Sequence, residues 1–283
     1  MGPIHTRAIG YLYSSQPPLC IGMVISRADS RLLTNSIHHY VVFPTTVRYY
    51  RDSAVTITLV GLLCAAVTAF LGFFQAPLVD PESWNAPEAY RILYWHVPFA
   101  WSSFISFSLL FIGAVSWYVK RSERGWSMVV IGSELGLLFG LGVVISGPIW
   151  GSVEWGVPWD WGDVRLNTYA LLTSVALFLV MSLRSQPDGE ETRDTLAAVG
   201  LFGFILVPIT AAATTIWRNR HPGVILRESE ETGVDPEIVQ VMGFGAISFM
   251  ILFIGLVLLN YSIYNLRSEL ESLNREIDKE GMN

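Results

Sequence analysis

Charged residues are scarce in this sequence, since Asp, Glu, Lys and Arg together make up only 15% of its 283 residues, and only two of these are lysines. A soluble domain of this length rarely carries so few charges. Hydrophobic residues make up 52% and gather into blocks of about twenty, the length that crosses roughly 30 Å of hydrocarbon. The scarcity of charge therefore excludes an ordinary soluble domain and predicts a polytopic membrane protein.

Cysteine is also nearly absent, with only Cys20 and Cys64 in the chain. They fall in different segments, so we expect no disulfide. No C-x-x-C-H motif is present, which excludes a c-type cytochrome. Acidic residues outnumber basic ones by 24 to 18, and this balance argues against a nucleic-acid partner.

Six apolar blocks predict an all-α fold with six transmembrane helices. Helices joined by loops are expected because irregular backbone cannot face lipid. The predicted spans are Ala54–Phe74, Ile92–Val119, Met128–Ile149, Leu166–Leu183, Leu196–Trp217 and Val241–Tyr261.

The distribution of Lys and Arg predicts the orientation, because positive flanks are retained on the cytoplasmic side. With the N-terminus inside, inner segments carry 13 of the 18 positive residues and outer loops carry five. Both termini are therefore expected in the cytoplasm, in a multi-pass protein of the cell membrane. The outer loops would be 75–91, 150–165 and 218–240.

Three regions follow from this reading. Residues 1–53 are expected to form a tail that is poorly structured or amphipathic, and residues 54–261 the six-helix transmembrane domain. Residues 262–283 are expected to form a cytoplasmic amphipathic helix, against the membrane or a partner, with a solvated extension as the alternative. Its apolar positions are Leu266, Leu270, Leu273 and Ile277.

The loop 150–165 is unusually rich in tryptophan. It holds four of the ten tryptophans of the chain, Trp150, Trp155, Trp159 and Trp161. An interfacial aromatic belt explains one or two tryptophans at a helix end. Four in a loop containing glycine and proline favour a flat apolar platform for a large planar ligand.

Histidine supplies a second candidate feature at the same membrane face. Five histidines exist, and three of them lie in the N-terminal tail. The other two, His96 and His221, flank the outer ends of the second and fifth spans. Two imidazoles from separate helices can ligate a haem iron from its two sides while an aromatic loop covers the ring.

Charged residues beside these features have both functional and ordinary interpretations. Arginines could pair with haem propionates or snorkel to the interface. Asp160 and Asp163 could accept imidazole N–H groups or be solvated, and we expect Glu154 to be a solvated loop charge. The candidate arginines are Arg165, Arg218 and Arg220.

These segments resemble the signature of a known family, the cytochrome c assembly proteins with a tryptophan-rich WWD domain. The similar stretches are Gly147–Gly151, Trp155–Gly156, Trp159–Leu166, His96–Trp101 and Trp217–His221. The resemblance covers residues 54–261, and six helices with short loops indicate the CcmC type (haem exporter protein C).

The resemblance implies a b-type haem, bound non-covalently and transiently at the outer face with His96 and His221 as axial ligands. It further implies delivery of haem to a CcmE-like haem chaperone, beside CcmA- and CcmB-like transporter subunits, during cytochrome c maturation. The residues expected around the ring are Trp150, Trp155, Trp159, Trp161, Asp163 and Arg165.

A haem carrier is favoured over a catalyst, because no nucleophile–base pair adjoins the site. Two alternatives remain open, namely a haem lyase that attaches haem to apocytochrome c and a bis-His b-type membrane cytochrome. A permease-type transporter would need polar groups near the midplane. Glu134, the one acidic residue within a predicted span, therefore marks a position of unassigned role.

Overall fold

The computed structural model of the chain describes residues 45–216 and 234–281. These residues belong to one compact unit, Thr45–Asn283, and residues 1–44 lie outside the described residues. Every regular element in the described ranges is a helix, and six stretches are long and apolar enough to cross a membrane. The predicted all-α, six-helix membrane fold is confirmed.

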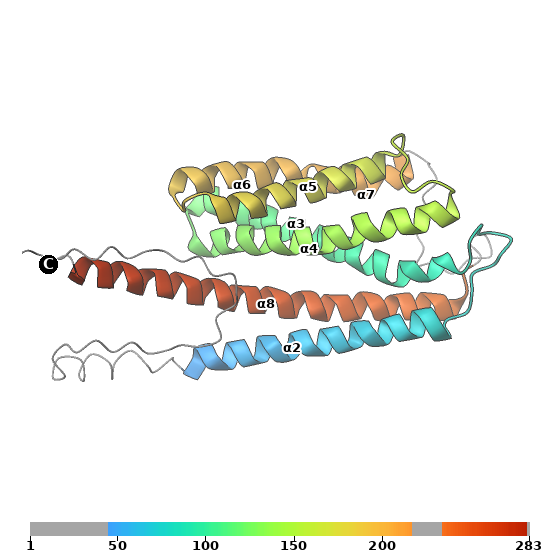
Figure 1. Cartoon of the computed structure of the whole chain (residues 1–283), viewed down its shortest axis with the longest axis horizontal. Helices are drawn as coiled ribbons and strands as arrows, with labels where there is room; N and C mark the ends of the chain where they lie inside the picture. The colour runs from blue at the N-terminus through green and yellow to red at the C-terminus, as the bar shows by residue number, and fades with distance from the viewer. Residues whose placement is uncertain (1–44, 217–233, 282–283) are drawn as a thin grey trace, which may run out of the picture. The chain divides into compact units, whose positions relative to one another are not determined.

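Successive membrane-spanning segments run in opposite directions through the unit, with α6 and α7 together forming one segment (Figure 1). Here η1 is a short π-helix and η2 a short 3₁₀ helix. The elements in chain order are α2 (Thr45–Phe70), η1 (Leu71–Gln75), η2 (Ala89–Ile92), α3 (Leu93–Lys120), α4 (Glu123–Glu154), α5 (Val164–Ser185), α6 (Glu190–Phe204), α7 (Leu206–Ile216) and α8 (Pro236–Gly281).

The unit has two ends, which we name from the turns found there. The loop end is where α4 gives way to α5, and the arginine end is where α3 turns into α4 at Arg121. Arg121 has a left-handed φ of 48°, and Ser122 then caps α4 by accepting a hydrogen bond from the Gly125 N–H at 3.3 Å. This cap allows two long helices to be joined by only two residues.

Helices α3 and α4 form the centre of the bundle, with α2 and α8 side by side on one side and α5, α6 and α7 on the other (Figure 1). Small residues permit the closest approaches, as is usual between membrane helices. A β-carbon at Gly132 of α4 would lie 2.6 Å from the backbone nitrogen of Leu110 of α3. A β-carbon at Gly255 of α8 would meet the backbone nitrogen of Thr58 of α2 at the same distance.

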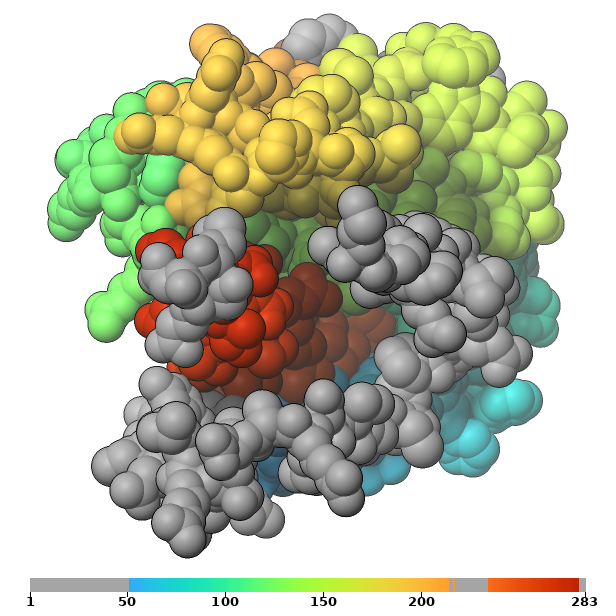
Figure 2. Space-filling view, turned by 60° about the vertical axis from the view of Figure 1, so that its left-hand side comes forward, coloured from blue at the N-terminus to red at the C-terminus, as the bar shows by residue number. Residues whose placement is uncertain are grey.

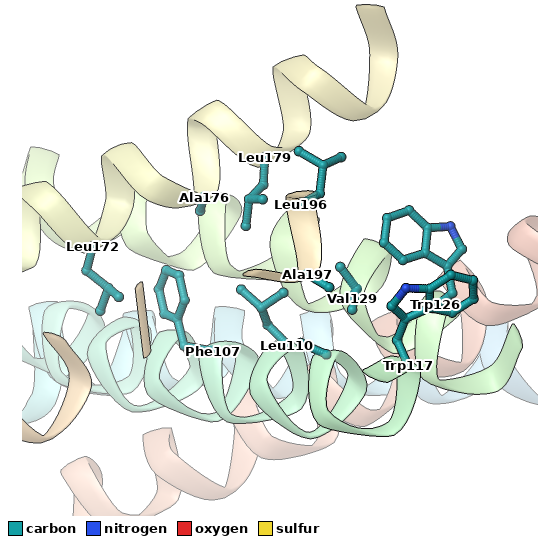
Figure 3. Close-up of a cluster of buried hydrophobic side chains, with 11 residues drawn as sticks. Phe107, Leu110, Trp117, Trp126, Val129, Leu172, Ala176, Leu179, Leu196 and Ala197 are labelled. Carbon is teal, nitrogen blue, oxygen red and sulfur yellow. The ribbon is translucent and has the colours of Figure 1, made fainter. Parts of the chain in front are cut away.

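A buried apolar cluster joins α3, α4, α5 and α6 in the half of the bundle nearer the arginine end (Figure 3). Leu110, Leu172 and Leu179 are at most 1% exposed within it. The cluster ends at the paired indoles of Trp117 and Trp126, whose ring centroids are 5.7 Å apart.

Arg193 of α6 lies against both of these indoles. Its guanidinium carbon is 5.3 Å from the ring centroid of Trp117 and 5.2 Å from that of Trp126. The same group donates hydrogen bonds to both carboxylate oxygens of Asp188, at 2.7 and 2.6 Å, and to Glu123 at 2.7 Å. One side chain therefore joins α3, α4, α6 and the turn before α6 by cation–π and ionic contacts.

The hydrogen bonds from Arg193 hold the pKa of the Asp188 carboxyl below its ordinary value. A lowered carboxyl pKa contributes stability above the ordinary value of about 3.9, and this contribution is lost as the pH falls through the lowered pKa. The Asp188 side chain is 59% exposed, so solvent screening keeps the contribution small.

The helices extend beyond the predicted spans. Helix α2 begins at Thr45 instead of Ala54, so residues 45–53 of the predicted tail are helical. Helix α4 continues to Glu154, so the predicted loop 150–165 shortens to residues 155–163. Hydropathy detects only the apolar part of a helix, whereas backbone hydrogen bonding continues wherever the sequence tolerates it.

The last two spans also differ in form from the prediction. The predicted fifth span is divided into α6 and α7 at Ile205, because Pro208 has no N–H to donate and its ring clashes with the carbonyl four residues earlier. Residues 262–281 continue α8 without a break instead of forming a separate helix. With 46 residues, α8 is about 69 Å long and exceeds a bilayer of about 45 Å.

Replacing Arg193 with Met should lower the thermal unfolding midpoint of the purified protein. The substitution keeps the aliphatic stem but removes the charge that contacts two indoles and two carboxylates, a loss of about 2 kcal/mol. Arg124→Met is the matched control, because Arg124 is exposed at the same end. Equal midpoints for the two variants would show that the arginine contacts do not stabilise the bundle.

Candidate functional site

A cavity lies at the loop end between α3, α4, α5 and the turn that joins α4 to α5. The wall is mainly apolar and aromatic, with one imidazole and one guanidinium. The lining residues that sequence analysis singled out are His96, Trp150, Trp155, Trp159 and Arg165.

His96 lies in the first turn of α3 and is oriented by α4. Its Nδ1 lies 2.9 Å from Oγ of Ser146, and that hydroxyl donates to the carbonyl oxygen of Gly142 at 2.6 Å. A Ser146 hydroxyl that donates to Gly142 can accept from Nδ1 of His96, and this arrangement would place the imidazole proton on Nδ1. That tautomer is the one in which Nε2 can ligate a metal.

Gly147 gives the imidazole its space on α4. A β-carbon at this position would lie 3.3 Å from Cε1 of His96, which is tighter than a normal carbon contact. Any larger residue would push the ring out of its present place. Ser146 and Gly147 together therefore hold His96 in its position.

Three tryptophans line the cavity, one from within α4 and two from the turn that follows it. Trp150 lies inside α4 and is 2% exposed, so it belongs to the helix and not to the predicted loop. Trp155 follows the helix and meets Trp150 edge to face, with ring centroids 4.8 Å apart. Trp159 lies further along the turn and donates from Nε1 to Oδ1 of Asn167 at 3.3 Å. The predicted aromatic platform thus forms at the junction of α4 and the turn.

The turn itself is held by hydrogen bonds and one glycine. Gly156 has a φ of 74°, a left-handed conformation that glycine adopts without strain and that commonly ends a helix. Asp163 caps α5 by accepting from the N–H groups of Arg165 at 2.8 Å and Leu166 at 3.3 Å. Asp160 accepts from the Gly162 N–H at 2.9 Å. The turn is therefore a built structure and not a loose loop.

Two predicted ring contacts do not line the cavity. Trp161 is 83% exposed and packs beside Trp159, with centroids 5.9 Å apart. Asp163 is 3% exposed and serves as the cap of α5. Both residues shape the turn, and Asp163 places Arg165 at the start of α5.

Arg165 brings a positive charge to the cavity wall. It is half-buried, and within residues 45–216 and 234–281 no ion pair of its guanidinium is recorded. A desolvated guanidinium is well suited to a carboxylate of a ligand, because it can donate two parallel hydrogen bonds.

Glu154 is not the solvated loop charge that the sequence led us to expect. It is 7% exposed and accepts from the backbone N–H groups of Asn85, at 3.2 Å, and Ala86, at 2.8 Å. The Asn85 side chain also donates to the Glu154 carbonyl at 3.1 Å. A buried carboxylate is stable there because backbone donors from a distant segment satisfy it.

Trp84 was not identified from the sequence. The Glu154 contact brings its segment to the loop end, where the ring lies 6.3 Å from Trp150 and 5.0 Å from Tyr90, centroid to centroid. Its location in a short loop on the same predicted face was the only available signal. Trp84 extends the aromatic cluster behind the cavity.

Three predicted site residues cannot be placed. His221, Arg218 and Arg220 lie outside the described residues, as does Trp217. Helix α7, which leads to them, ends at Ile216 at the loop end, and α5 packs against α7.

The family model for CcmC, described as Heme exporter protein C, matches residues 38–276. The chain is 26% identical over 225 residues to the Heme exporter protein C of Bradyrhizobium diazoefficiens, which covers 79% of this chain and 85% of that protein. It is 26% identical over 201 residues to the Escherichia coli K12 protein of the same name, covering 70% and 79%.

A ccmC-like mitochondrial protein of cytochrome c biosynthesis from Arabidopsis thaliana is 29% identical over 217 residues, 75% of this chain and 80% of that protein. The family match includes the segments that form the loop-end cavity. The family match extends from the residues before α2 well into α8. The chain therefore belongs to the CcmC family, Heme exporter protein C.

Proposed function

We propose that this protein binds haem in the loop-end cavity and hands it on during cytochrome c maturation. The observation that carries the proposal is His96, which Ser146 holds in an aromatic cavity that also contains Arg165. The relatives named Heme exporter protein C support it. A planar, apolar macrocycle with carboxylate side chains matches this combination of groups.

Different residues would contact different parts of the bound haem. His96 and His221 would be the axial ligands of an iron that accepts one nitrogen on each side. Trp150, Trp155 and Trp159 would contact the ring, and Arg165 would pair with a propionate. Trp161 and Asp163 would act by fixing the turn. Binding would be non-covalent, as in a b-type haem.

We further propose that the loop end faces the outside of the cell membrane and that both termini are cytoplasmic. The excess of Lys and Arg at the arginine end and in the C-terminal part of α8 supports this orientation. Haem would then be held where an outer haem chaperone can reach it.

A carrier role requires release as well as binding. His221 could leave the iron as a ligand of a CcmE-like chaperone arrives, while His96 stays fixed by Ser146. CcmA- and CcmB-like transporter subunits would be the membrane partners. The hydroxyl beside His96, that of Ser146, donates to the Gly142 carbonyl, an arrangement that holds the imidazole in place and favours a carrier over a haem lyase.

The first test is the optical spectrum of the detergent-purified protein expressed with haem available. Wild type should show a low-spin bis-His spectrum, and His96→Ala and His221→Ala should each lose it or change it to high spin. His39→Ala is the control, because it removes a histidine from the tail. Intact spectra in both site variants would refute the proposed ligands.

Ser146→Ala should weaken haem binding about tenfold, because loss of a partner that orients a metal-binding histidine commonly costs 10- to 100-fold in affinity. Haem titration followed by absorbance measures the effect, and Ser146→Thr should restore affinity. Ser152→Ala is the matched control on α4, since Ser152 bonds only the Ile149 carbonyl. Equal affinities for both alanine variants would mean that Ser146 does not position His96.

Delivery can be tested in membranes that contain a CcmE-like chaperone. His221→Ala should abolish loading of the chaperone with haem, because ligand exchange needs a second imidazole that can leave. Normal loading by this variant would rule out the exchange model. Formation of the cytochrome thioether by the purified chain alone would instead identify a haem lyase.

A further inference from the structure

A second cavity, of about 460 Å³, lies between α4, α5 and α8 toward the arginine end. In Figure 2, α4 is seen in green between α8, in red, and the yellow segments above it. Leu138, Leu141 and Ile263 line the cavity and are 50, 43 and 38% exposed. Because these side chains lie on membrane-spanning helices, the cavity is open sideways to the hydrocarbon of the bilayer.

The charged side chains in this cavity are Arg184, Arg267 and Glu134. Within the described ranges neither arginine has a recorded ion pair, whereas Arg121 and Arg193 at the same end are both paired with carboxylates. Two guanidinium groups and one carboxyl leave the cavity with net positive charge whether or not Glu134 is ionised. Such a site selects an anion.

The length of the cavity matches one leaflet. Its lining on α4 runs from Val130 to Leu141, a rise of eleven residue steps or about 16 Å along the helix. Half of a hydrocarbon core of roughly 30 Å is about 15 Å. The apolar wall therefore has the length of an acyl chain and not of a helix that crosses the whole membrane.

The two arginines lie at the interfacial end of this wall. Gly140 of α4 faces Thr173 of α5, and the helices are antiparallel, so Arg184 lies level with Val129. Glu134 is five residues further in, or about 7.5 Å deeper. Arg267 lies near the level of Glu123, because Tyr264, one turn before it, donates to that carboxylate at 3.4 Å.

This order restricts the ligand. A phosphate held at Arg184 and Arg267 places the head-group alcohol further out and the acyl chains further in, beside Glu134. A lipid with a net negative charge is attracted by the net positive charge of this cavity, whereas a zwitterionic lipid carries no net charge and is attracted less.

We propose that this cavity binds an anionic phospholipid of the phosphatidylglycerol class from the leaflet at the arginine end. Its phosphate lies between Arg184 and Arg267, and its acyl chains lie along Leu138, Leu141 and Ile263. Basic pockets between membrane helices recognise anionic head groups in this way. The site is separate from the loop-end cavity and does not depend on haem binding.

The test is native mass spectrometry of the purified full chain with dioleoyl phosphatidylglycerol and dioleoyl phosphatidylethanolamine in equal amounts. Wild type should retain phosphatidylglycerol in clear preference to phosphatidylethanolamine. Arg184→Gln and Arg267→Gln should each reduce its retention about tenfold, as expected for loss of one charged hydrogen-bonding group. Circular dichroism and the unfolding midpoint without lipid establish that each variant is folded.

Two controls separate this site from general attraction of anions. Arg124→Gln removes an exposed arginine at the same end that does not line the cavity and should leave retention unchanged. Glu134→Gln should keep or increase the retention of phosphatidylglycerol, because this substitution removes only a negative charge. Equal retention of the two lipids would overturn the proposal, and so would equal losses of phosphatidylglycerol in Arg124→Gln and the two cavity variants. Occupation of the cavity by a helix of another protein would also overturn it.

Discussion

The close approach of α3 and α4 is the constraint on which both ends of the bundle depend. Gly132 allows the backbones to come within a distance that a β-carbon would prevent. At the loop end the same helix pair places His96 of α3 against Ser146 and Gly147 of α4. At the arginine end it places the indoles of Trp117 and Trp126 beside each other. Separating these helices would disturb both regions together.

Two carboxylates hold the loop end together by accepting hydrogen bonds from backbone N–H groups. Glu154 accepts two backbone N–H groups from the segment after η1, and Asp163 accepts two at the start of α5. Each buried charge is compensated by donors that would otherwise lack partners in an apolar setting. These contacts bring Trp84 to the aromatic cluster and Arg165 to the cavity wall, and so assemble the proposed haem site from distant segments.

The two cavities differ in the way their charges are used. At the loop end one guanidinium and one oriented imidazole stand among rigid indoles, an arrangement suited to a planar ligand with carboxylates. Toward the arginine end two guanidinium groups stand at the head of an acyl-length apolar wall, an arrangement suited to a lipid. Pairing of Arg121 and Arg193 with carboxylates leaves Arg184 and Arg267 as the cations that define the second cavity.

The sequence alone determined the class of fold and pointed to several residues that line the loop-end cavity. Twenty-residue apolar blocks have one solution in a bilayer, so six helices were predictable. The clustering of tryptophan with His96 and Arg165 was also visible, because all lie near helix ends on one face. The exact ends of the helices could not be predicted, because polar turns extend a helix without changing its hydropathy. Trp150 was therefore predicted to lie in the loop, whereas it lies in α4.

Only the tertiary structure decided which charges are structural and which are available to a ligand. Glu154 and Asp163 look alike in the sequence as acidic residues of a loop, yet each is buried with backbone donors that packing supplies. The Nδ1 atom of His96 likewise contacts a serine fifty residues away. Such pairings depend on helix register and on glycine-mediated distances, which no local pattern encodes.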